Sequence, residues 1–245
     1  MKQLTVGSAL HASSSIACVL LIGWATANAQ TSSAPANSPE PRTYRCGLKS
    51  IVVPPPTSDL NELGSDYRVL MESAVPDTNR LIAAFLPAED AANVRAGISK
   101  AVARYAMIET LRRAEFVDVD SDTLKQVANS VAQQYGANLG ASMTDQQEEL
   151  NHKLRAMRGS STTITLDKPL QLGVFFSKPD SVGFGAIMPL SAAGTTVKMI
   201  VGMTILRVQD RLIYAYIYAN YKDDDSIQWV RKTSEQWADS ILKAN

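Results

Sequence analysis

The second half of the chain has a hydrophobic pattern with a period of two residues. The alternation is clear in residues 164–166, in residues 172–176 and across residues 197–221. A period of two puts successive side chains on opposite faces of a strand, so each of these segments is predicted to be a strand. The longest segment is predicted to be a β-hairpin that turns at Gln209 and Asp210.

The pattern changes to a helical period in the last part of the chain, at residues 227–244. Its apolar positions lie three and four residues apart and include Val230, Trp237 and Ile241. This spacing places them on one face of a helix. We therefore expect Trp237 to anchor the helix against the core, and Trp229 to lie off the buried face.

Two further helices are predicted in the middle of the chain. Ser121 or Asp122 caps the first, which ends at Gly136. Its apolar face is formed by Leu124, Val127, Ala128, Val131 and Tyr135. A capping box that starts at Thr144 opens the second helix, which is polar and runs to about Met157.

The elements before residue 120 are shorter. Residues 48–53 and 79–86 are predicted strands that end at prolines, and residues 88–96 form a short predicted helix. Residues 100–116 fit both a strand and a helix, because their apolar positions satisfy both periods. We favour a strand there.

The N-terminus has the pattern of an export signal. A basic residue precedes an apolar run at residues 16–27, and the small residues Ala27 and Ala29 form a signal-peptidase motif. The run rises about 18 Å as a helix, against about 30 Å of membrane hydrocarbon. We expect cleavage between Ala29 and Gln30 and a periplasmic or secreted protein with no transmembrane segment in the mature chain. The alternatives are an uncleaved anchor and a lipid on Cys18.

The remaining chain is predicted to be a tether followed by one domain. Residues 30–43 are rich in Ser, Ala and Pro, which favours a disordered tether. Residues 44–245 do not alternate regularly between strand and helix, and no dinucleotide or phosphate-binding glycine motif follows a strand. The fold class that we expect is therefore α+β: one mostly antiparallel sheet with packed helices, a sandwich whose C-terminal β-hairpin is followed by a long helix.

Composition excludes several functions. The chain has 24 Lys and Arg against 24 Asp and Glu, which gives no basic surface for nucleic acid. With 2 His and 2 Cys, it has little material for a metal site, and we expect neither a metal nor another cofactor. No catalytic motif is recognisable, so no catalytic residue is predicted.

The candidate binding residues are three tyrosines on one predicted strand. Tyr214, Tyr216 and Tyr218 alternate with small and aliphatic residues, so their rings share one face. They could form an aromatic surface for a small or apolar ligand. The alternative, which we favour, is a central strand covered on both faces, with Tyr216 the most buried ring.

Two isolated reactive side chains have simpler explanations. Cys46 is the only cysteine after the leader, and we expect an inert packed thiol; intermolecular pairing and reactivity are the alternatives. His152 lies four residues after Glu148, a spacing found in metal sites, but a third ligand has no evident source. We expect a solvated helix face there.

Two charged groups also have structural interpretations. The acidic run Asp223–Asp225 precedes the last helix, where Asp225 or Ser226 would cap the N-terminus. The other group is predicted to form structural ion pairs and comprises Arg104, Glu109, Arg112, Arg113 and Glu115.

Several segments resemble a family of uncharacterised exported proteobacterial proteins. They are residues 79–85 (NRLIAAF), 104–106 (RYA), 172–175 (LGVF), the hairpin at 204–221 and the helix end at 237–245. At the level of fold, the chain also resembles the PsbP-like α/β/α sandwich. The resemblance implies a small exported accessory protein and supplies no catalytic residues.

The function that we expect is that of a non-enzymatic accessory or interaction protein of the cell envelope. The alternative is a small-ligand binding module that uses the face of Tyr214, Tyr216 and Tyr218. A third hypothesis is a hydrolase that uses Glu109 or Glu115. The expected partner is accordingly an envelope protein or a small ligand.

Overall fold

The computed structural model describes residues 41–64, 68, 71–72, 75–95, 102–137, 139–158, 163–192 and 194–245. The predicted leader and most of the predicted tether lie outside these residues. Among the described residues, the first element already begins at Arg42, so the last two residues assigned to the tether belong to a strand.

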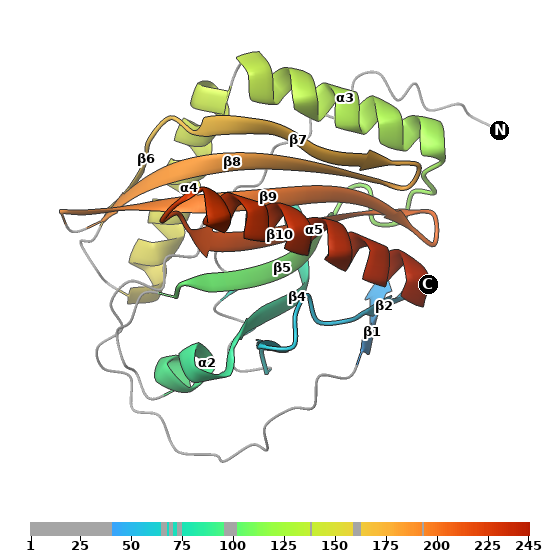
Figure 1. Cartoon of the computed structure of the whole chain (residues 1–245), viewed down its shortest axis with the longest axis horizontal. Coiled ribbons are helices and arrows are strands. Elements are labelled where there is room, and N and C mark those ends of the chain that lie inside the picture. Colours follow the sequence, from blue (N-terminus) through green and yellow to red (C-terminus); the bar gives the residue numbers. More distant parts are fainter. Residues whose placement is uncertain are drawn as a thin grey trace.

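The fold is a single α+β domain built on one antiparallel sheet, as the sequence predicts (Figure 1). The eight strands described in this sheet are β3 (Leu60–Glu62), β4 (Asn79–Pro87), β5 (Arg104–Leu111), β6 (Ile164–Leu166), β7 (Leu170–Lys178), β8 (Ser181–Ala192), β9 (Thr195–Val208) and β10 (Arg211–Asn220). Their order is β3-β4-β5-β10-β9-β8-β6, and β7 also pairs with β8. A separate hairpin pairs β1 (Arg42–Cys46) with β2 (Lys49–Val53).

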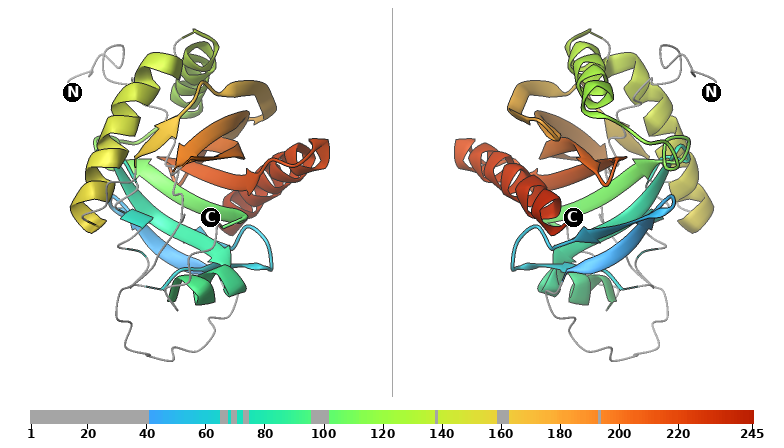
Figure 2. Two further views of the ribbon diagram at one scale, coloured as in Figure 1. Left: turned by 90° about the vertical axis from the view of Figure 1, so that its left-hand side faces the viewer. Right: turned by 90° about the vertical axis from the view of Figure 1, so that its right-hand side faces the viewer.

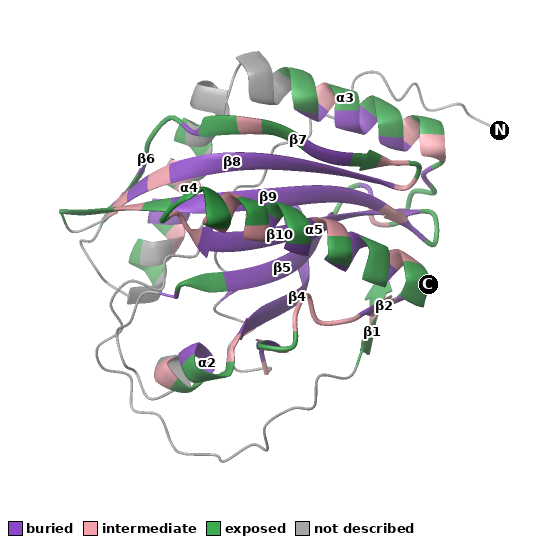
Figure 3. Ribbon diagram, in the orientation of Figure 1, coloured by how far each residue is buried: buried purple, intermediate pink, exposed green. Residues whose placement is uncertain are grey.

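Helices cover both faces of the sheet (Figure 2). The described helices are α2 (Ala88–Arg95), α3 (Ser121–Ala137), α4 (Leu139–Arg158) and α5 (Asp224–Ala244). Apolar side chains of α3 and α4 pack on one face, and α5 packs with the β1–β2 hairpin on the other. The central strands are therefore buried on both sides, while the outer faces of α3 and α5 are exposed (Figure 3).

Several predicted elements are confirmed. Residues 104–111 form a strand, β5, which settles the ambiguity between strand and helix there. The hairpin turns at Gln209 and Asp210, which both have positive φ values, as a tight hairpin turn requires. Trp237 is buried on α5, whereas Trp229 is partly exposed.

The main omission of the sequence prediction is β8. Two glycines and Pro189 interrupt its apolar pattern, so the segment lacks the alternation that identifies a strand. The glycines have a packing reason, because a Cβ on Gly183 or Gly185 would overlap the ring of Phe176 or Phe175. The rings of β7 thus lie directly on the backbone of β8.

The sequence prediction also misplaces the first residues of two helices, α3 and α4. Asp120, rather than Ser121 or Asp122, caps α3: its side chain accepts a hydrogen bond of 2.7 Å from the backbone N–H of Thr123. The helix α4 begins at Leu139, so the capping box at Thr144 lies inside it. Short polar side chains follow one another at these sites, and local sequence does not distinguish the capping residue from its neighbours.

The helix α5 also begins earlier than predicted. Asp223 is its N-cap, and the side chain accepts a hydrogen bond of 2.9 Å from the backbone N–H of Ser226. The predicted caps, Asp225 and Ser226, lie within the helix. The hydrogen bonds from Ser226 lower the pKa of Asp223, which favours the charged form that suits the positive end of a helix.

Candidate functional site

The three candidate tyrosines are buried in the core. Tyr214, Tyr216 and Tyr218 are 4%, 2% and 0% exposed and belong to the core cluster that packs beneath α3. Tyr105 stacks on Tyr218 from the neighbouring strand, with 4.2 Å between ring centroids. The prediction of a covered strand is confirmed. Tyr218 is the most buried of the three, so the prediction for Tyr216 is wrong; the ring of Tyr218 stacks with those of both Tyr105 and Tyr216.

Glu109 lies on the same face of the sheet as these rings and is completely buried. Asn79 donates a hydrogen bond of 2.7 Å to its Oε2 atom, while its Oε1 atom has no hydrogen-bond partner among the described residues. Burial raises the pKa of Glu109 to about 8, and the hydrogen bond from Asn79 only partly opposes this shift. The carboxyl is therefore mainly protonated at neutral pH.

The predicted charged group does not form one site. Glu109 points into the core, whereas Glu115 lies in the turn after β5 and pairs with Arg80. Arg112 donates a hydrogen bond of 3.1 Å to the backbone oxygen of Asp77, and Arg104 stacks on Trp229. Neither glutamate lines the cleft described below, so the geometry does not favour the hydrolase hypothesis.

An exposed apolar patch lies at the end of β5. Leu48, Phe116 and Val117 are 78%, 66% and 51% exposed. They come from two segments that touch, because Gly47 packs against the backbone of Glu115 and Phe116. We call these three side chains the Phe116 patch. Large apolar side chains that gather in this way on a surface typically mark an interaction site.

A partly buried ion pair holds together the two segments that carry the Phe116 patch. Glu115 accepts hydrogen bonds of 3.0 and 2.6 Å from Nε and Nη2 of Arg80, and another of 3.0 Å from the backbone N–H of Gly47. Burial opposes ionisation of Glu115, but these bonds outweigh it and hold its pKa below the ordinary value. Arg80 also donates to the backbone oxygen of Arg45, so both segments are held together.

Basic side chains border the patch. Arg45 and Lys49 flank the turn that carries Leu48, and Arg45 donates a hydrogen bond of 3.3 Å to the backbone oxygen of that residue. Arg112 opens the turn that carries Phe116, but its side chain donates a hydrogen bond to the backbone oxygen of Asp77 and is not part of this border. The surface thus combines an apolar centre with a basic edge formed by Arg45 and Lys49.

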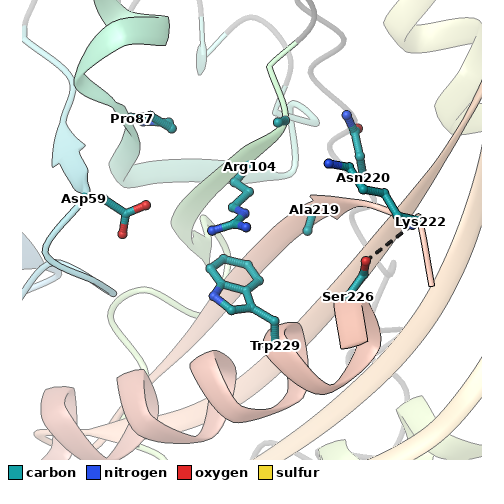
Figure 4. A pocket seen from close by; sticks show the side chains of 9 residues that line it. Asp59, Pro87, Arg104, Ala219, Asn220, Lys222, Ser226 and Trp229 are labelled. Atoms are coloured by element: carbon teal, nitrogen blue, oxygen red, sulfur yellow. Dashed lines mark hydrogen bonds between the residues drawn. The ribbon is translucent and has the colours of Figure 1, made fainter. Parts of the chain in front are cut away.

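A cleft of about 280 Å³ lies at the other end of β5 (Figure 4). The guanidinium carbon of Arg104 lies 4.5 Å from the ring centroid of Trp229, as in a cation–π pair. Asp59 approaches from one side, and Asn220 and Lys222 from the other. The floor includes the small side chain of Ala219. The cleft therefore presents an aromatic ring and charges of both signs.

Sequence reasoning missed both surfaces. Trp229 carries one signal, since a tryptophan off the buried face of an amphipathic helix lies partly at the surface. The apolar pair Phe116 and Val117, just after a charged segment, carries the other. The contacts with Leu48 and Arg104 are long-range, so no local pattern contains them.

The two isolated reactive side chains, Cys46 and His152, lie where the sequence predicts. Cys46 is fully buried in the core cluster under α5, and His152 is exposed on α4, as predicted. The described residues contain no group of three or more His, Cys, Asp and Glu side chains that could hold a metal ion. Among the described residues, no helix is both long enough and apolar enough to cross a membrane.

We expect the thiol of Cys46 to be nearly inert in the folded protein. Burial raises its pKa, which lowers the fraction of reactive thiolate, and the side chain has no exposed surface. In a chain that starts at Gln30, a maleimide should label Cys46 at least roughly 100-fold more slowly under native conditions than in denaturant, as measured by mass spectrometry. Equal rates would contradict the buried position.

Comparisons with known proteins give no family assignment. No protein-family model matches the sequence, and no curated protein matches it. Among solved structures, the Ran-binding protein Mog1p of Saccharomyces cerevisiae is 11% identical, with a TM-score of 0.30 over 84% of this chain and 95% of that chain. A mutant of the protein Mog1 is 12% identical, with a TM-score of 0.32 over 84% of this chain and 94% of that chain. These scores are too low to carry an argument about fold or function.

Proposed function

We propose that this protein is an exported, non-enzymatic accessory protein of the cell envelope that binds another envelope protein through the Phe116 patch. The patch is the observation that carries the proposal. Its three side chains remain exposed although each would be stabilised by burial, by about 25 cal/mol per Å² of apolar area. A partner that covers them supplies that burial.

The rigidity of the patch supports a binding role. The Glu115–Arg80 pair and the contact of Gly47 with the turn hold Leu48 and Phe116 in place before any partner arrives. A preorganised surface loses less conformational entropy on binding than a flexible one. The basic edge formed by Arg45 and Lys49 favours a partner whose contact surface is apolar at the centre and acidic beside that edge.

The N-terminal pattern supports the proposed location. The apolar run at residues 16–27 and the motif ending at Ala29 are typical of a cleaved signal, and residues 30–40 have the composition of a tether. Cleavage would release the domain into the envelope with residues 30–40 as a free N-terminal tail, and the domain could then meet partners there. Mass spectrometry of the exported protein should find Gln30 at its N-terminus; an intact Met1 or a lipid on Cys18 would contradict this part of the proposal.

Site-specific crosslinking in the native envelope tests the contact surface. A photoreactive phenylalanine analogue at position 116 should give one discrete adduct with an envelope protein, which mass spectrometry identifies. The same analogue at Lys168, which is exposed between β6 and β7, is the matched control and should give none.

The partner found in this way is then tested directly. Phe116→Ser should weaken its binding at least roughly tenfold, a change of about 1.4 kcal/mol. The melting temperature should hardly change, because the replaced ring is mostly solvent-exposed. The proposal fails if adducts form equally at positions 116 and 168, or if Phe116→Ser binds as the unmodified protein does.

A further inference from the structure

The cleft beside Trp229 is lined by charged side chains of both signs. Some charged side chains elsewhere in the fold are paired, for example Lys178 with Glu235 and Arg211 with Asp118. In the cleft, by contrast, Asp59, Arg104 and Lys222 have no ion-pair partner among the described residues, although all three line one space. Opposite charges thus face a common volume without neutralising one another.

We infer that this cleft binds a small zwitterion, a molecule of the amino-acid type that carries a carboxylate and an ammonium group. Arg104 and Lys222 suit the carboxylate, and Asp59 suits the ammonium group. The indole of Trp229, Pro87 and Ala219 offer apolar surface to a side chain of the ligand. A volume of about 280 Å³ suits a ligand smaller than a typical drug molecule.

A simple anion or a simple cation fits this arrangement less well. Asp59 would repel an anion, and the acidic first turn of α5, with Asp224 and Asp225, offsets the positive end of that helix. Arg104 and Lys222 would repel a cation. A molecule that carries both charges can use each group of the cleft.

The backbone around the cleft is fixed by the sheet. Arg104 pairs across the strands with Ala219, and the backbone N–H of Asn220 donates a hydrogen bond of 2.9 Å to the oxygen of Ala103. Trp229 stands on the second turn of α5, which its N-cap anchors. The ends of β5 and β10 therefore position the binding groups, as rigid elements do in precise sites.

This site is separate from the Phe116 patch. The eight residues of β5 lie between them and span about 23 Å at the rise of a strand. Phe116→Ser should therefore leave ligand binding in the cleft unchanged, and the two proposals can fail independently.

Three matched probes test the inference in calorimetric titrations of the chain that starts at Gln30. Leucine carries both charges, 4-methylpentanoic acid lacks the ammonium group, and 3-methylbutylamine lacks the carboxylate. Leucine should bind at least tenfold more tightly than either analogue. Binding should also change the fluorescence of Trp229, whereas the buried Trp237 should not respond.

Charge-removing variants assign the groups. Arg104→Gln should weaken the binding of leucine at least tenfold and leave the binding of 3-methylbutylamine unchanged. Asp59→Asn should weaken the binding of leucine and leave the binding of 4-methylpentanoic acid unchanged. Lys168→Gln, at the far edge of the sheet, is the control and should bind leucine normally. The inference is overturned if leucine does not bind up to its solubility limit, if the acid alone binds as tightly, or if all variants bind leucine equally.

Discussion

Replacing Trp237 with alanine is expected to lower the free energy of unfolding by about 3–5 kcal/mol, a large part of the 5–15 kcal/mol typical of a domain. The indole is 1% exposed and packs edge to face on Phe85, with 5.7 Å between ring centroids. Its N–H donates a hydrogen bond of 2.8 Å to the backbone oxygen of Pro54. The side chain thus ties α5 to β4 and to the segment after β2, and its removal leaves both a cavity and an unpaired carbonyl.

Trp229→Ala is the matched control on the same helix. Its ring is partly exposed and forms a cation–π pair with Arg104, so its loss should lower stability by only about 1 kcal/mol. Urea unfolding followed by far-ultraviolet circular dichroism compares the two without depending on indole fluorescence. Equal losses would mean that Trp237 is not the anchor of α5.

The phase of α5 is predictable from sequence because burial alone decides it. Val230, Trp237 and Ile241 face the sheet, and no competing contact changes their spacing. The hairpin of β9 and β10 is predictable for a similar reason. Both strands lie at the centre of the sheet, so their apolar residues form long runs interrupted at a turn with a clear local signal.

Elements in which contacts with another strand or turn determine the residues are not predictable in the same way. Gly183 and Gly185 leave room for rings of β7, and this requirement removes the apolar side chains that would reveal β8. Gly47, with φ of +58°, is similar: a Cβ there would meet the backbone of Glu115, far away in sequence. At such positions a tertiary contact requires glycine, so the residue type does not reflect a local preference for strand or helix.

The charged segment around β5 shows the same limit for sites. Arg104, Glu109 and Glu115 are close together in the sequence, but the structure separates them. Arg104 lines the cleft, Glu109 is buried in the core, and Glu115 forms an ion pair with Arg80. Each of these residues contacts a partner that is far away in the sequence. The partners are Trp229 for Arg104, Asn79 for Glu109 and Arg80 for Glu115. The residue types are visible beforehand, but their partners are not.

Glu109 should make the stability of the protein depend on pH. Its folded pKa is raised by burial from an ordinary value of 4.5 to about 8. Between these values the folded state keeps a proton that the unfolded chain releases, so the free energy of unfolding falls as pH rises, by about 1.4 kcal/mol per pH unit from this group. From pH 5 to pH 8 the contribution is on the order of 3 kcal/mol.

Glu109→Gln is expected to remove this slope, because the amide stays neutral and can still accept the hydrogen bond from Asn79. Glu115→Gln is the control: the pKa of Glu115 is lowered, so its carboxylate stays charged throughout this range and its loss should change stability equally at both pH values. Urea titrations at pH 5 and pH 8 measure both variants against the unmodified protein. If the pH slope survives in Glu109→Gln, the buried carboxyl is ionised in the folded state, and the protonated form inferred from its burial is wrong.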